Sequence, residues 1–224
     1  MKKTLRWALW LMFLCPFGYL FMIWNTLPEK VPLHFNIEGK ADGFGSRGEL
    51  LAMVVFLVVL NIGTFYLVTN AHKLDPKKKY SQENKPGIRK LGVSVSIFLT
   101  TTILFVIYSV SKGAQGIAAK GDFVFSAVGL LYCVIGNYMY NIKQNNFAGI
   151  RIPTTLRDEE NWRKTHQMAG KLWFWGGLVT AVLCFFLPSK QGFIVFISIT
   201  VLLTAIPIVF SLKLDRKKEN RSAP

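Results

Sequence analysis

Arg151 and His166 are the side chains best suited to bind or react, and both lie in one polar segment of the chain. The guanidinium of Arg151 is permanently charged and can bind a carboxylate, a backbone carbonyl or a lipid phosphate through two parallel hydrogen bonds. Pro153 holds the residues just before it extended rather than helical. Trp162, Thr165 and His166 share one face at helical spacing. We expect His166 to pack against a partner rather than to act in catalysis, so the segment is a candidate binding site.

The polar pattern of this segment also predicts the element that positions it. Thr155 precedes Asp158 by three residues, and a hydroxyl in such a place can cap a free helix N–H. Acidic residues 158–160 followed by basic residues 163–164 complement a helix dipole. The pattern predicts an interfacial helix that leads straight into the next apolar stretch, with Trp162 as an anchor at the membrane interface.

A second polar segment, residues 27–46, differs in character. Pro28 and Pro32 disfavour a helix there, and the residues after Pro28 alternate between apolar and polar types. The alternation predicts a short extended piece near the membrane surface. Followed by a glycine-rich turn, this piece would present His34, Asn36 and Asp42 together.

The same loop raises the question of a metal site. His34, Glu38 and Asp42 are spaced by four residues and would stack on one face of a helix, but the prolines and glycines around Gly39 argue against a helix. We therefore expect no metal and no cofactor. Two interpretations stay open for the loop: a folded cap whose polar groups satisfy one another, and a surface that recognises a ligand or peptide.

The rest of the chain is dominated by apolar stretches. Six of them contain no Lys, Arg, Asp or Glu, namely residues 7–27, 50–71, 91–111, 123–142, 172–189 and 191–212. A helix needs about 20 mostly apolar residues to cross the roughly 30 Å hydrocarbon core of a bilayer. Strand alternation is absent from these stretches, and helices satisfy their own backbone in lipid. The sequence therefore predicts an all-α polytopic membrane protein with six transmembrane helices.

The basic residues predict which way the helices run. Three lie before the first stretch, seven between the second and third, six between the fourth and fifth, and five after the sixth. The other three connections hold three, two and one. The positive-inside rule then places both termini in the cytoplasm. The net charge of +15 is thus explained by topology and anionic lipid rather than by direct nucleic-acid binding.

No pattern of residues indicates an enzyme. The sequence lacks a nucleophile elbow, a zinc-protease motif and a phosphate-binding loop. The apolar stretches contain no ionisable carboxylate or histidine, which active transporters usually need. We expect Asn61 and Asn137, which lie within these stretches, to hydrogen-bond between helices. No catalytic residue is assigned.

Both polar segments resemble a known family. The inner one carries Gly149, Arg151, Pro153, Thr155 and Leu156, followed by Trp162, Thr165, His166 and Gly170. Together with Asn137 upstream, this pattern resembles the signature of the SdpI family, although Thr154 occupies a position that is commonly Trp. Residues 31–36 with Gly39 and Asp42 are similar to the uncharacterised domain that precedes the SdpI segment in many members.

The resemblance implies a multi-pass protein of the bacterial plasma membrane. Members of this kind give immunity to a secreted antimicrobial peptide or toxin, and can hold a transcriptional repressor at the membrane. On this interpretation the outer loop would meet the toxin and the inner loop a cytoplasmic partner. The alternative is a transporter of small molecules or lipids, or a lipid-handling membrane enzyme, that uses the same two loops.

The expected organisation has four parts. They are an N-terminal two-helix segment with the outer loop (1–70), a basic cytoplasmic loop (71–90), an SdpI-like four-helix membrane domain (91–212) and a basic cytoplasmic tail (213–224).

Overall fold

The computed structural model describes residues 3–36, 40–70, 85–113, 123–145 and 148–222. Its helices are α1 (Lys3–Ile23), α2 (Arg47–Asn70), α3 (Lys85–Ser111), α4 (Phe123–Met139), α5 (Pro153–Arg157), α6 (Glu159–Phe186) and α7 (Ser189–Ser222). A 3₁₀ turn, η1 (Trp24–Thr26), leads to two strands, β1 (Lys30–Phe35) and β2 (Ala41–Ser46). Most of the predicted basic loop 71–90 lies outside the described residues.

Helices α1, α2, α3, α6 and α7 are each long and apolar enough to cross a membrane. The sixth apolar helix, α4, has 17 residues and is shorter than the predicted stretch. It ends early because Asn141 and Ile142 donate their backbone N–H groups to carbonyls only three residues back. The chain is therefore an all-α, multi-pass membrane protein, as the apolar stretches predict.

Two helices extend beyond their apolar stretches, the first of them as predicted. The interfacial helix and the fifth apolar stretch form one continuous helix, α6, of 28 residues. Helix α7 has 34 residues and continues through most of the predicted basic tail. At a rise of 1.5 Å per residue it is about 51 Å long, so about 20 Å of it must lie outside a 30 Å hydrocarbon core.

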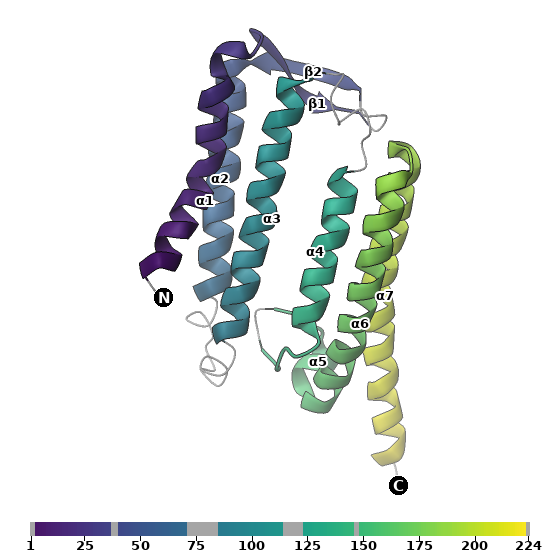
Figure 1. Ribbon diagram of the computed structural model, residues 1–224. Coiled ribbons are helices and arrows are strands. Elements are labelled where there is room, and N and C mark those ends of the chain that lie inside the picture. Colours follow the sequence, from purple (N-terminus) through teal and green to yellow (C-terminus); the bar gives the residue numbers. More distant parts are fainter. Residues whose placement is uncertain (1–2, 37–39, 71–84, 114–122, 146–147, 223–224) are drawn as a thin grey trace.

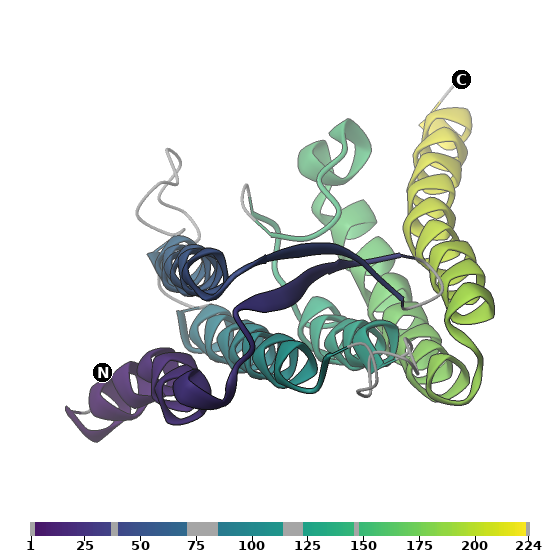
Figure 2. The ribbon, with the colours of Figure 1, turned by 90° about the horizontal axis from the view of Figure 1, so that it is seen from above.

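The helices form one bundle whose two ends differ (Figure 1). The hairpin of β1 and β2 lies at one end, and both chain termini, with α5, lie at the other. Helix α3 contacts α1 and α2 on one side and α4 on the other, while α6 contacts both α4 and α7. Seen from above, the hairpin reaches across the bundle from the α1–α2 side toward α6 and α7 (Figure 2).

Apolar packing fixes the base of the hairpin on the first three helices. Val31 of β1 is fully buried in a cluster with Leu20, Leu50, Val54 and Ile107. At the end of β2, the side chain of Glu49 accepts the Ser46 N–H at 2.6 Å and the Ser46 hydroxyl accepts the Glu49 N–H at 3.2 Å. This reciprocal capping box joins the hairpin rigidly to the start of α2.

Glycines set the close approach of α4 and α6. A Cβ on Gly136 would lie 2.7 Å from the Gly170 carbonyl oxygen, and a Cβ on Gly129 would lie 2.7 Å from that of Gly177. The backbones therefore touch where larger side chains would hold them apart, as is common where membrane helices pack.

A tryptophan compensates a proline in α7. Pro207 has no N–H, so the carbonyl of Leu203, four residues earlier, loses its helical partner. The Trp173 indole Nε1–H of α6 donates to that oxygen at 2.8 Å. The bond satisfies a carbonyl that would otherwise be unpaired within the membrane.

Candidate functional site

His166 is the centre of the inner loop. Its Nε2 accepts the Ile150 N–H at 2.9 Å, so this nitrogen carries no proton and the proton is on Nδ1. Nδ1–H then donates to the Trp162 carbonyl oxygen at 2.8 Å. The ring is 1% exposed and stacks on the Trp162 indole with centroids 3.9 Å apart. His166 is a neutral imidazole that binds the backbone of Ile150 and Trp162. The expectation that its side chain is packed against another residue is confirmed by the stacking on Trp162.

Gly149 allows the loop to come this close to the ring. Its φ is +107°, a conformation that L side chains rarely adopt. A Cβ there would lie 2.4 Å from His166 Nε2 and 3.4 Å from Trp162 Cη2. Both the backbone angle and the contact require glycine.

Further hydrogen bonds brace the loop between α4 and α6. The Thr155 hydroxyl donates to the Ile150 carbonyl at 2.7 Å and accepts the Ile152 N–H at 3.2 Å. The Gln144 amide donates to the carbonyls of Thr155 and Leu156 at 2.8 and 2.9 Å. Thr155 thus caps the short helix α5 rather than the long helix α6 that follows.

The expected role of Trp162 at the membrane interface is wrong. The side chain is 1% exposed, and its Nε1–H donates to the Ile142 carbonyl at 2.8 Å. Helical spacing correctly placed it beside His166, but this pattern cannot distinguish a face that meets lipid from a face that meets protein.

A buried polar network ties this loop to α7. The Asn161 Oδ1 accepts the hydroxyls of Thr165 at 3.0 Å and Ser211 at 2.8 Å, and its Nδ2 donates to the Ser211 carbonyl at 3.0 Å. Because the Ser211 proton is used on Asn161, the Thr154 hydroxyl must donate to Ser211 Oγ, 2.6 Å away. Sequence analysis missed Asn161, Thr154 and Ser211, since no local pattern relates residues fifty positions apart.

Two ion pairs extend the same junction beyond the buried network. Arg157 pairs with Asp215 at 2.5 Å, and Asp158 pairs with Lys218 at 2.8 Å. Asp158 also caps α6 by accepting the Glu160 N–H at 3.0 Å. The hydrogen bond from Lys218 is the main cause that lowers the pKa of the Asp158 carboxyl.

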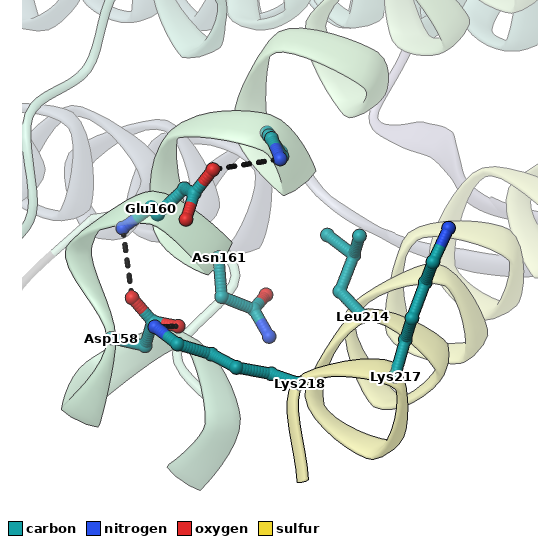
Figure 3. A pocket seen from close by; sticks show the side chains of 7 residues that line it. Asp158, Glu160, Asn161, Leu214, Lys217 and Lys218 are labelled. Atoms are coloured by element: carbon teal, nitrogen blue, oxygen red, sulfur yellow. Dashed lines mark hydrogen bonds and ion pairs between the residues drawn. The ribbon is translucent and has the colours of Figure 1, made fainter. Parts of the chain in front are cut away.

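A charged pocket of about 300 Å³ lies between the start of α6 and the end of α7. Figure 3 shows Lys218 reaching from α7 to Asp158, while Lys217 points away from it. Glu160, which lines the pocket beside Asp158, pairs with Lys164 at 2.7 Å. The two carboxylates of the pocket are therefore already engaged by lysines of this chain.

The remaining residues of the inner motif face outward. Arg151 and Pro153 are exposed, and Leu156 is 38% exposed. The motif thus divides into residues that build the loop and exposed residues that the packing does not use. Of the first group, Thr155, Trp162, Thr165 and His166 are buried, while Gly149 is exposed and contributes through its backbone.

The outer loop is a hairpin, as its alternation and glycines indicate. His34 Nδ1 lies 2.5 Å from Asp42 Oδ1, and the two side chains are 73% and 44% exposed. The Asn36 Oδ1 accepts the Lys40 N–H at 2.9 Å and so helps to close the turn. His34 and Asp42 are thus brought together as predicted, whereas Asn36 contacts Lys40 at the turn. Gly39 and Glu38 lie outside the described residues. Among the described residues no cluster of three or more His, Cys, Asp or Glu could hold a metal ion.

The two asparagines of the apolar stretches have different roles. Asn61 is buried, and its Nδ2 donates to Thr100 Oγ1 at 2.9 Å and to the Ser96 carbonyl at 3.2 Å, which joins α2 to α3 as expected. Asn137 is exposed on α4, and its side chain has no hydrogen bond within the described part of the chain. The expected bond between helices is therefore wrong for Asn137.

Both polar segments of the chain lie in regions that match known protein families. Residues 141–211 match the SdpI/YfhL protein family, and residues 11–58 match a domain of unknown function, DUF1648. The chain is similar to a protein named "Immunity protein SdpI" from Bacillus subtilis (strain 168), with 24% identity over 192 residues. This alignment covers 84% of the chain and 83% of that relative. No solved structure matches. The resemblance to the SdpI family is confirmed: a segment that matches DUF1648 and a segment that matches the SdpI/YfhL family lie in one multi-pass membrane protein.

Proposed function

We propose that the protein is a membrane immunity protein without catalytic activity, which gives its cell resistance to a secreted antimicrobial peptide or toxin. The observation that carries the proposal is the similarity to an immunity protein over 84% of the chain, so that the alignment is too long to omit either loop entirely. The hairpin would engage the toxin, and the opposite end of the bundle would recruit a transcriptional repressor.

The chemistry of the two loops supports this assignment. Both ring nitrogens of His166 are hydrogen-bonded to backbone atoms, and the hydroxyl of Thr155 is bonded on both sides. Groups engaged in this way serve to hold the loop, which supports a role without catalysis. On the hairpin, His34 and Asp42 are exposed and available to an extended peptide.

The test is a resistance assay in a sensitive bacterial host. Cells with and without the gene are exposed to culture supernatants from bacteria that secrete antimicrobial peptides, and growth is measured. We expect protection by the wild-type protein and loss of protection with His34→Ala and with Asp42→Asn. Lys30→Ala, at an exposed position on the same hairpin outside the pair, should leave protection unchanged.

Membrane levels of each variant are measured by immunoblotting, so that loss of protein is distinguished from loss of activity. Identical growth with and without the gene in every supernatant would reject the immunity function. Turnover of a substrate by the purified, reconstituted protein would instead support the transporter or enzyme alternative. Repressor recruitment is tested separately, by comparing the proteins that co-purify with wild type and with His34→Ala in toxin-treated and untreated cells.

A further inference from the structure

Arg151 carries a charge that no described residue of the chain compensates. Its side chain is exposed, and no ion pair or hydrogen bond engages it within the described part of the chain. Three carboxylates of the adjoining helices are already paired: Asp158 with Lys218, Glu160 with Lys164, and Asp215 with Arg157. A guanidinium on this loop therefore remains available to an anion from outside the chain.

The loop that presents Arg151 is held rigidly on both sides of it. The neighbouring Ile150 N–H is bonded to His166, and the Ile152 N–H is bonded to Thr155. A backbone fixed in this way loses little conformational entropy when the side chain binds a ligand. The backbone that presents the guanidinium is therefore preformed.

Contacts with α7 place this loop at the edge of the apolar surface. Thr154, three residues after Arg151, bonds to Ser211 of α7. The next residue, Leu212, is 44% exposed and ends the apolar part of α7, after which Lys213 begins the basic extension. Leu156 of the loop is itself 38% exposed. Exposed apolar and basic side chains that meet at one level mark the boundary between the hydrocarbon and the headgroups.

We propose that Arg151 binds the phosphate of a membrane phospholipid, with Pro153 and Leu156 lying against the upper part of its acyl chains. The planar guanidinium matches two phosphate oxygens with parallel hydrogen bonds, which a lysine ammonium cannot reproduce. The inference concerns lipid binding by the resting protein and does not depend on the proposed immunity function.

The experiment is native mass spectrometry of the purified full-length protein in detergent, titrated with phosphatidylglycerol. We expect Arg151→Ala to weaken lipid binding by about tenfold or more, because both charge-assisted hydrogen bonds to the phosphate are lost. Arg151→Lys should lie between Arg151→Ala and wild type. Arg163→Ala, which removes an exposed arginine of α6 outside the loop, is the matched control and should bind like wild type.

Two further measurements keep the result interpretable. Thermal unfolding in detergent should be the same for wild type and Arg151→Ala, because the side chain has no ion-pair or hydrogen-bond partner among the described residues to lose. An excess of inorganic phosphate should not displace the lipid, since free phosphate lacks the acyl chains that Leu156 contacts. Equal lipid binding by Arg151→Ala and Arg163→Ala would overturn the proposal, and would assign Arg151 to a protein partner if resistance were still lost. Displacement by inorganic phosphate would overturn the lipid as the source of the anion.

Discussion

At the scale of single residues, the inner loop is organised by a contact between a ring and a backbone. His166 binds Ile150 through Nε2, and the adjacent Gly149 has no side chain to interfere with that nitrogen. The same ring is stacked on Trp162, which is anchored to Ile142 through its indole N–H. Replacing Gly149, Trp162 or His166 should therefore loosen the whole inner loop, while the transmembrane helices keep their own packing.

Gly149→Ala should destabilise the protein more than a positive φ alone explains. The backbone angle costs about 1–2 kcal/mol for any L side chain, and the clash with His166 adds to it. Gly113→Ala is the matched control, because Gly113 also has a positive φ, +63°, but nothing within 4 Å of a new Cβ. Thermal unfolding in detergent measures both variants. Equal losses of stability would show that the contact with His166 does not constrain position 149.

Much of this site could be predicted from local pattern. Helical spacing placed Trp162, Thr165 and His166 on one face, and the alternation around His34 predicted an extended piece with Asp42 close by. The burial of Trp162 could not be predicted, because it depends on which helix packs against that face. The same limit applies to the bonds between Asn161 and Ser211, since tertiary contacts alone bring these residues together.

At the scale of elements, α6 and α7 act as one unit that extends from the bilayer. The sequence predicts an interfacial helix that leads straight into a short fifth span, because charged residues 158–164 come directly before that apolar stretch. The structure shows one helix, since Asp158 caps its start and the polar side chains of its first turns are bonded to α7 or to each other. Within the bilayer, Trp173 and Leu203 join the same two helices.

The bond between Trp173 and Leu203 should depend on Pro207. We expect Trp173→Phe to cost about 1 kcal/mol, because the Leu203 carbonyl is then left unpaired in the membrane. In a Pro207→Leu background, residue 207 regains an N–H for that carbonyl, so Trp173→Phe should cost less. A double-mutant cycle of unfolding free energies measures the difference. Trp175→Phe, at a 63% exposed position of α6, is the control, and additive effects of the first pair would contradict the compensation.

At the scale of the whole molecule, the two loops lie at opposite ends of the bundle and are joined by a continuous series of helix contacts. The hairpin packs on α3 through Val31 and Ile107, α3 contacts α4, and the glycines of α4 and α6 bring these two helices into backbone contact. A receptor that responds to toxin would need two alternative arrangements of these helix contacts. Binding at either end of the bundle would have to favour one arrangement over the other. The tight glycine contact favours joint movement of α4 and α6 over sliding between them.

The direction of the bundle in the membrane is the last prediction, and it rests on charge. Both termini lie at the same end as α5, and the connections predicted at that end hold most of the 27 basic residues. The positive-inside rule therefore places Arg151 in the cytoplasm and Lys40 of the hairpin outside.

Cysteine labelling tests this direction. Single cysteines replace Lys40, Lys78, Lys120 and Arg151 in turn, in a chain whose native Cys15, Cys133 and Cys184 are changed to Ser. A membrane-impermeant maleimide should label positions 40 and 120 in intact cells, and positions 78 and 151 only after permeabilisation. Labelling of position 151 in intact cells would reverse the topology, and would place the hairpin where no secreted toxin could reach it.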